Sequence, residues 1–375
     1  MSLLHDPDRP GQDHEIESSA FGAPVTVDHE ALRRLVAGIF AAVDVPEDDA
    51  DLAADVLVMG ELRGVDTHGV ANLAPRYVRW IQEGFINPRP RWRTTRGGTA
   101  LRNVDGDAGL GVVVAARVMQ ETIEIARETG IAMSLVHNSR HLGMAAYHAM
   151  LAMEQGMIGL CTTAVRARMV PTFGREPRIG TNPIAVAVPT GEQPAFVFDA
   201  ATTTVAANNL RIRSLRGVEA PVAWLVREDG TNPDAPEVPQ EPFRLTPLGG
   251  SPEGASYKGY GLAAIVDTLG LVLSQATYGG AIKGGQAGHT VAAIDVDTVM
   301  PLDEFRVAMD AYIAYLRATS PAAGHDEVLV AGDPQHRTEV VRRRDGIPFP
   351  AAAAEWVLEN ADRFGVEGSA DLVLE

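Results

Sequence analysis

Apolar side chains in the first part of the chain recur at helical spacing. Within residues 28–43 they follow one another at intervals of three and four, which predicts an amphipathic helix. Pro46 suits the first turn of a second helix that ends near Gly64. A third helix is predicted at about residues 73–82, and glycine and prolines then end this helical opening.

In the middle of the chain, short apolar runs alternate with segments of helical spacing. Strands are predicted at 99–104, 131–136, 157–162, 184–188, 196–198, 222–226 and 290–294. Helices are predicted at 112–128, 144–154, 260–273, 302–316, 336–344 and 351–364. Residues 229–256 are rich in Pro and Gly and are predicted to be loop. The pattern predicts an α/β protein with helical ends.

Composition narrows the possible partners. With 32 basic against 49 acidic residues, the net charge of −17 argues against nucleic acid or an anionic membrane surface, both of which need clustered positive charge. No apolar run is long enough to cross a membrane, and residues 1–24 form a polar leader predicted to be disordered. The single cysteine, Cys161, fits a reducing compartment, so we expect a cytoplasmic protein.

Two glycine- or histidine-bearing segments follow predicted strands. Residues 106–111 read Gly-Asp-Ala-Gly-Leu-Gly between a strand and a helix, but the spacing differs from a dinucleotide fingerprint, and a tight turn is the simpler interpretation. His137 and His141 lie four apart beyond the next strand, without a Glu or Cys nearby, so we predict no metal site. A loop histidine there is a candidate for acid–base chemistry, the alternative being a capping or surface histidine.

Polar residues in three further segments are candidate ligand contacts. Thr67 and His68 lie in a polar break between two helices, where the hydroxyl can orient the ring; a plain helix–helix turn is the alternative. Residues 180–183 and 199–204 bring small and hydroxyl residues next to strands, which suits ribose or phosphate contact as well as ordinary turns. Lys258, one of two lysines in the chain, begins an apolar helix and indicates an anionic partner.

In this order, the motifs resemble the malate/L-lactate dehydrogenase family that is not of the Rossmann type, with its ureidoglycolate and sulfolactate dehydrogenase and piperideine-carboxylate reductase relatives. The resemblance covers residues 25–365. It implies a non-Rossmann NAD(P)-binding sheet domain at 96–299 and a helical second domain built from 25–95 and 300–375. It also implies a homodimer with its active site near the domain cleft.

The resemblance carries roles onto matching positions. It implies that His68 or His141 exchanges the proton, with Thr67 in place of the family's serine. The residues assigned to the cofactor, NAD or NADP, are Asn182, Asp199, Ala200, Ala201, Lys258, Val330, Ala331, Gly332 and Asp333. The residues assigned to the substrate are Asn72, Arg140, Arg166, Arg168, Thr202 and Thr203.

The substrate site departs from the family pattern. Asn72 stands where relatives carry an arginine that holds the substrate carboxylate, and an asparagine cannot form that charged pair. We therefore expect poor turnover of simple 2-oxo acids, unless Arg140, Arg166 or Arg168 supplies the charge. The sequence predicts an NAD(P)-dependent enzyme that moves a hydride to or from C2 of a small 2-oxo acid, 2-hydroxy acid or cyclic imine. The alternatives are an enzyme of the same fold that has left redox chemistry, such as a lyase, and a non-catalytic ligand-binding homologue.

Overall fold

A mixed seven-stranded sheet forms the centre of the described structure. The computed structural model describes residues 24–277, 281–282 and 285–374, so nearly all of the predicted leader lies outside the described residues. The strands lie in the order β2-β3-β4-β8-β5-β6-β7. Their bounds are β2 Arg93–Gly97, β3 Leu101–Asp105, β4 Ile131–Ser139, β5 Met157–Ala164, β6 Ile184–Val188, β7 Phe196–Ala200 and β8 Ala287–Asp295.

The strand directions separate this sheet from a dinucleotide-binding sheet of the Rossmann type. Only the β3–β4 pair is parallel, and the other neighbouring pairs of this sheet are antiparallel. A Rossmann sheet is mostly parallel, with a helix crossing over between successive strands. The predicted α/β class with a non-Rossmann sheet is confirmed.

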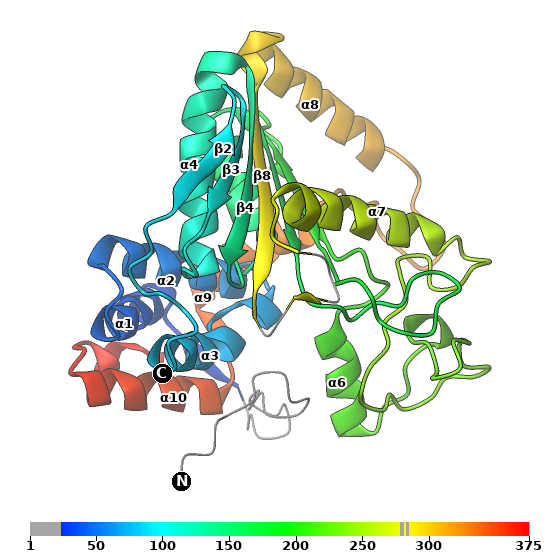
Figure 1. Cartoon of the computed structure of the whole chain (residues 1–375), viewed down its shortest axis with the longest axis horizontal. Helices are drawn as coiled ribbons and strands as arrows, with labels where there is room; N and C mark the ends of the chain where they lie inside the picture. Colours follow the sequence, from blue (N-terminus) through cyan, green and yellow to red (C-terminus); the bar gives the residue numbers. More distant parts are fainter. Residues whose placement is uncertain (1–23, 278–280, 283–284, 375) are drawn as a thin grey trace.

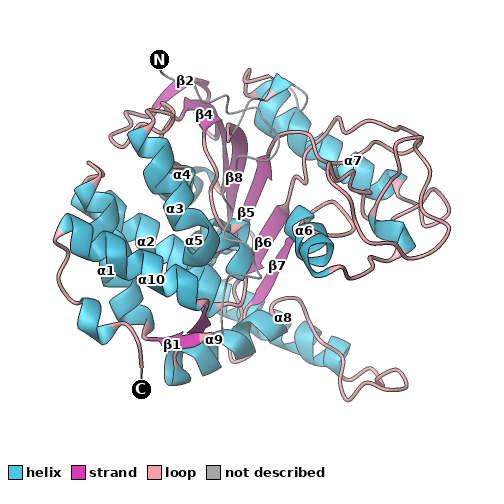
Figure 2. Cartoon of the chain, turned by 90° about the horizontal axis from the view of Figure 1, so that it is seen from below, coloured by secondary structure: helices cyan, strands magenta, loops and turns pink. Residues whose placement is uncertain are grey.

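Helices cover both faces of the sheet (Figure 2). On one face lie α4 (Gly111–Thr129) and α5 (Ala145–Glu154), and on the other lies α7 (Tyr257–Asp267), which continues as a π-helical turn over Thr268–Leu273. The α5 helix approaches β5 very closely, because a Cβ at Gly159 would lie 2.0 Å from the carbonyl oxygen of Ala149. Only glycine permits that contact.

The two ends of the described part of the chain come together below the sheet (Figure 1). The helices of this layer are α1 (His29–Ala42), α2 (Glu47–Leu62), α3 (Val70–Gln82) and α10 (Ala351–Phe364). The short strands β1 (Val25–Val27) and β9 (Ile347–Phe349) pair antiparallel and tie the termini. The α1 helix begins where predicted, because the Asp28 carboxylate caps it by accepting the backbone N–H of Ala31 at 2.8 Å.

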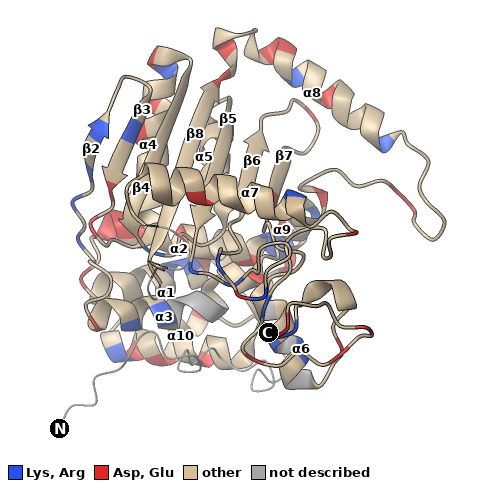
Figure 3. Cartoon of the chain, turned by 45° about the vertical axis from the view of Figure 1, so that its right-hand side comes forward, with Lys and Arg blue, Asp and Glu red and all other residues tan. Residues whose placement is uncertain are grey.

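One buried apolar cluster runs through the terminal helices and the sheet, from Val27 to Leu372. The helix α8 (Leu302–Arg317), which the sequence grouped with the terminal helices, lies near the far end of the sheet from α1 (Figures 1 and 2). Acidic and basic residues are interspersed along α8 (Figure 3). None of the described helices combines the length and the hydropathy that a membrane span needs.

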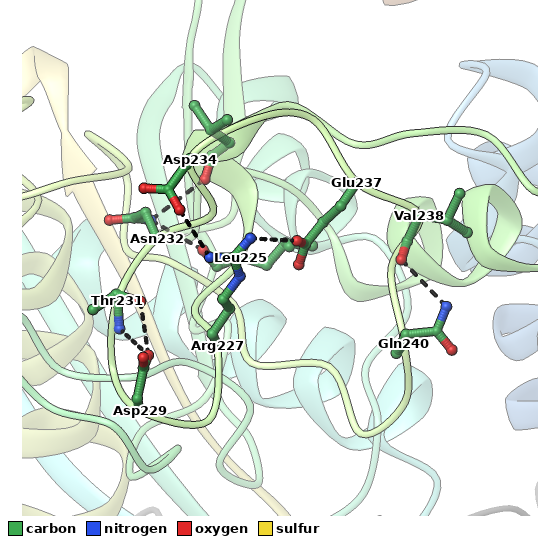
Figure 4. Close-up of polar contacts among 10 residues, drawn as sticks. Leu225, Arg227, Asp229, Thr231, Asn232, Asp234, Glu237, Val238 and Gln240 are labelled. Carbon is green, nitrogen blue, oxygen red and sulfur yellow. Dashed lines mark hydrogen bonds and ion pairs between the residues drawn. The ribbon is translucent and has the colours of Figure 1, made fainter.

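A loop-rich segment forms a second, smaller apolar cluster with α6 (Ala207–Arg216). The strand predicted at 222–226 is wrong, because Val222–Trp224 forms a 3-10 turn. Polar contacts hold the loop that follows: Arg227 pairs with Asp234 at 3.2 Å and with Glu237 at 2.9 Å (Figure 4). Short local turns and ion pairs therefore take the place of sheet pairing here.

Candidate active site

A cavity of about 640 Å³ lies where the helical layer meets the β7 end of the sheet. Its walls come from the 3-10 turn Asp66–His68, from α3, from the loop between β4 and α5, and from the loop that leads into α9 (Asp333–Asp345). The polar residues that line it are Arg63, Thr67, His68, Arg76, His141, Thr181, Asp199 and Gln335.

The two predicted histidines lie against each other in this cavity. The rings of His68 and His141 stack with their centroids 5.5 Å apart and their planes at 21°. The hydroxyl of Thr67 lies 2.9 Å from Nδ1 of His68, as expected for a group that orients the ring. Residues more than seventy positions apart in sequence thus form one stacked pair.

The hydrogen bonds of His141 fix its tautomer. The backbone N–H of Gly143 donates to Nδ1 at 3.0 Å, so Nδ1 carries no proton and the neutral ring holds its proton on Nε2. The hydroxyl of Tyr77 lies 3.1 Å from the same nitrogen and also donates to the carbonyl oxygen of His141 at 3.2 Å. His141 therefore has Nε2–H available as a hydrogen-bond donor, and the residue lines the cavity.

Both rings are neutral at neutral pH. Burial, followed by the positive charge of Arg76, lowers the pKa of His68 from 6.5 to about 4. The pKa of His141 lies well below its usual value, through burial and then through the charges of His68, Arg76 and His289. If Nδ1 of His68 donates to Thr67, its Nε2 accepts a proton. One ring can then donate to a ligand oxygen while the other accepts from it.

Two further buried histidines hold the loop that carries His141. His289 of β8 donates from Nε2 to the carbonyl oxygen of Arg140 at 3.1 Å, and its Nδ1 lies 2.9 Å from the Thr163 hydroxyl. His148 of α5 donates from Nε2 to the carbonyl oxygen of Leu142 at 2.8 Å. Burial lowers the pKa of His289 to about 3 and that of His148 to about 4, so both stay neutral. The carbonyls on either side of His141 are thus fixed.

The glycines at 106–111 support the same loop and do not line the cavity. A Cβ at Gly111 would lie 2.0 Å from the carbonyl oxygen of Arg140 and 2.4 Å from that of His141. The absent side chain therefore lets the start of α4 pack directly against the loop backbone. His137 lies apart from the pair, with its Nδ1 3.0 Å from the Asn103 side-chain oxygen.

The end of β7 brings an acidic group to the opposite wall. The Asp199 carboxylate is open to the cavity and accepts the backbone N–H of Ala146 at 2.7 Å. The surrounding protein removes water from it and raises its pKa to about 6, while the Ala146 bond and the Arg63 charge oppose that shift. Ala200 and Ala201 line the cavity next to it.

The loop before α9 closes this wall. Val330, Ala331 and Gly332 line the cavity, and the Ala331 carbonyl accepts the backbone N–H of Val197 in β7 at 3.1 Å. Asp333 lies just outside the lining, where it accepts the backbone N–H of Val330 at 2.8 Å and pairs with Arg317 at 2.6 Å. Its carboxylate therefore shapes the loop.

Several predicted site residues do not reach the cavity. Asn182 is fully buried and uses its amide nitrogen on Ala263 and Asp267 at 3.0 and 2.6 Å. The other predicted residues outside the lining are Arg166, Arg168, Thr202, Thr203 and Lys258. Thr202 and Thr203 donate to backbone carbonyls, and Lys258 is exposed on α7. The side chain of Asn72 lies outside the described residues.

The sequence predicts that Arg140 binds a carboxylate, but in the structure its guanidinium is occupied by contacts within the protein. Its guanidinium donates to the carbonyl oxygens of Phe85 and Ser139, each at 2.9 Å, and lies 4.3 Å over the Phe85 ring. The cationic residues in the cavity lining are Arg63 and Arg76. Sequence reasoning missed both, together with Tyr77, His148 and His289, because no local motif marks them.

Comparison of the sequence with known proteins identifies a family and several relatives. The family described as malate/L-lactate dehydrogenase matches residues 27–357. A malate dehydrogenase of Pyrococcus horikoshii is 36% identical over 350 residues, covering 92% of this chain and 97% of that protein. An L-sulfolactate dehydrogenase of Methanocaldococcus jannaschii is 32% identical over 321 residues, covering 84% and 90%.

Solved structures agree with the sequence matches. The crystal structure of a malate dehydrogenase from Entamoeba histolytica superposes with a TM-score of 0.87 at 30% identity, covering 92% of this chain and 99% of that one. The resemblance drawn from the sequence motifs is confirmed.

Proposed function

The chain belongs to the malate/L-lactate dehydrogenase family, and from that premise we propose that His68 and His141 exchange the proton while a hydride moves to or from C2 of a small 2-hydroxy or 2-oxo acid. The enzyme is an oxidoreductase, as its relatives are named. The stacked histidine pair, in one cavity with the Asp199 segment, is the observation that carries the assignment of roles.

The wall formed by β7 and the loop before α9 fits a nicotinamide cofactor. Asp199 offers carboxylate oxygens that can accept hydrogen bonds from ribose hydroxyls, as acidic groups do in other dinucleotide sites. Ala200, Ala201 and Gly332 leave room beside it, since their side chains are small or absent. A nicotinamide held there would supply or take up the hydride at its C4 carbon.

We assign opposite proton roles to the two rings. His141 has its proton on Nε2 and donates a hydrogen bond to the reacting oxygen, whether that oxygen is a carbonyl or a hydroxyl. His68 uses Nε2 as the proton acceptor when a hydroxy acid is oxidised, with Thr67 holding its Nδ1. A neutral His68 suits the oxidation of a hydroxy acid, because its Nε2 takes up the proton that the hydroxyl loses. In the reverse direction His68 first takes up a proton from solvent, and its Nε2 then gives that proton to the oxygen of the reduced 2-oxo acid.

Three measurements test this function. Titration with NADH and with NADPH, followed by nicotinamide fluorescence, identifies the cofactor, and L-malate, L-lactate and the corresponding 2-oxo acids test turnover. His68→Asn and His141→Asn should each lower turnover by about 10²–10⁴-fold without changing cofactor affinity. Binding without turnover would favour a non-catalytic homologue. Silence with both nucleotides would favour an enzyme that has left redox chemistry, such as a lyase.

We also propose a homodimer that resides in the cytoplasm. The α7 helix and its π-helical extension leave Ile265, Val272 and Leu273 exposed by 57%, 59% and 51%. An exposed apolar row of this kind is typical of a subunit interface. We propose that a second copy of the chain covers it. Light scattering that gives a monomer mass at micromolar concentration would refute the dimer.

A further inference from the structure

The histidine side of the cavity carries a positive charge that none of the sequence motifs indicated. Arg76 of α3 lines the cavity together with His68 and His141. Its guanidinium carbon lies 5.6 Å from the centre of the Trp80 ring, which supports the planar group from one side. Side chains on a helix lean toward its N-terminus, so Arg76 leans toward the turn that carries His68.

The other cationic group in the lining, Arg63, acts on a different part of the cavity. Arg63 pairs with Glu339 at 2.8 Å, and its charge acts on Asp199 at the opposite wall. Arg76, in contrast, acts on both histidines, because its charge is among the causes that lower the pKa of each ring. The two charges therefore serve different parts of the cavity.

We propose that Arg76 binds the anionic group of the substrate and so determines which substrates the enzyme accepts. This proposal rests on the hydride-transfer function proposed above. A planar guanidinium can give a carboxylate two parallel hydrogen bonds, and it does so close to where the histidine pair meets the reacting oxygen.

The location of Arg76 also limits the shape of the substrate. The group that it binds and the oxygen that the histidines hold must lie within one small molecule, because all three residues line one cavity and the Arg76 charge acts on both rings. A 2-oxo or 2-hydroxy acid meets this condition, since its carboxylate is attached to the reacting carbon. Simple 2-oxo acids thus belong to the substrate range, against the expectation drawn from Asn72 alone.

The test compares charged and neutral substrates in matched variants. Wild type, Arg76→Gln and Arg76→Lys are assayed with pyruvate, oxaloacetate and neutral methyl pyruvate at saturating NAD(P)H. Arg79→Gln is the control, because it removes the same charge from the same helix at a residue that pairs with Glu83, outside the cavity lining.

Arg76→Gln should lower kcat/KM for the acids by about 10- to 150-fold, mainly through a higher KM, because one charged hydrogen-bonding group is lost. Turnover of methyl pyruvate should change by less than about threefold, because the neutral ester has no charged carboxylate for the Arg76 guanidinium to bind. Arg76→Lys should recover part of the loss, as lysine keeps the charge but not the planar fork. Equal losses for acid and ester, or none for the acid, would overturn the role.

A binding measurement separates this proposal from the proposed function. Oxamate, an unreactive isostere of pyruvate, is titrated by calorimetry into wild type and Arg76→Gln, both with NAD(P)H and without it. If no hydride transfer occurs but oxamate binding depends on Arg76, the anion site stands and the proposed function fails. If hydride transfer occurs while oxamate binds both proteins equally, the function stands and the role of Arg76 fails. Absence of oxamate binding to wild type also overturns that role.

Discussion

The pH dependence of hydroxy-acid oxidation tests the assignment of His68 as proton acceptor. The acceptor must be neutral, and an ordinary histidine with a pKa near 6.5 loses this form below neutral pH. Burial and the Arg76 charge lower the pKa of His68 to about 4. At pH 5.5 an ordinary histidine is about 10% neutral, whereas a ring with that lowered pKa is about 97% neutral. We therefore expect kcat/KM to remain near its plateau at pH 5.5.

The assay follows nicotinamide reduction at saturating cofactor, so that protonation of Asp199, with its pKa raised to about 6, does not limit the rate through cofactor binding. The kcat/KM profile is the correct readout, because it reports groups of the enzyme before the hydroxy acid binds. His325→Gln, at an exposed loop position, is the control. Circular dichroism at each pH verifies that the protein stays folded.

A profile that falls with a midpoint at pH 6.5 would refute the reasoning, because the acceptor would then be a solvated histidine outside this pair. A profile unchanged in His68→Asn would refute the assignment to His68. If the fall occurs near pH 4 and the substitution abolishes the activity, the lowered pKa and the role are both supported.

Further predictions concern the shell around the site. Protons bind His148 and His289 in the unfolded chain below pH 6.5 but not in the folded one, so these two rings together should contribute about 4 kcal/mol to the fall in the free energy of unfolding between pH 7 and pH 5, measured by urea denaturation. His289→Leu should lose about half of this contribution; an unchanged slope would contradict the buried neutral ring. Asp333→Ala should weaken NAD(P)H binding about 10-fold, because the 330–332 loop loses its bond to Asp333, and fluorescence titration with unchanged affinity would show that the loop holds without it. Ile265→Glu should favour monomers in light scattering, and a dimer of undiminished strength would place the interface elsewhere.

Local patterns in the chain identified most of the regular structure. The helices α1, α4 and α10 bury one side, so their apolar spacing is visible in the sequence. The strand β2 was missed because all five of its residues are exposed, which leaves no alternation to detect. The strands β1 and β9 were missed because each is three residues long and its partner lies at the other end of the chain.

The motifs gave the family and the position of the histidine pair but not the function of every polar residue in them. Asn182 belongs to a conspicuous Gly-Thr-Asn-Pro run, yet its side chain is buried and holds the turn against α7. Arg140 stands next to His141 in sequence, yet its guanidinium packs on Phe85. A residue's type and its neighbours in sequence do not say which way the side chain points once the loop is packed.

The sequence by itself determined the α/β class and the family and predicted the two histidines that share the cavity, because short-range spacing records which faces are buried and motifs mark loops with chemically active side chains. Only the tertiary structure decided how the cavity is charged and supported. In the fold, Arg76 lines the cavity together with the histidines, and the charge of Arg63 acts on Asp199. His289 holds the loop that carries His141. Their convergence depends on how the terminal helices dock on the sheet, and that docking is set by the apolar core that the terminal helices share with the sheet.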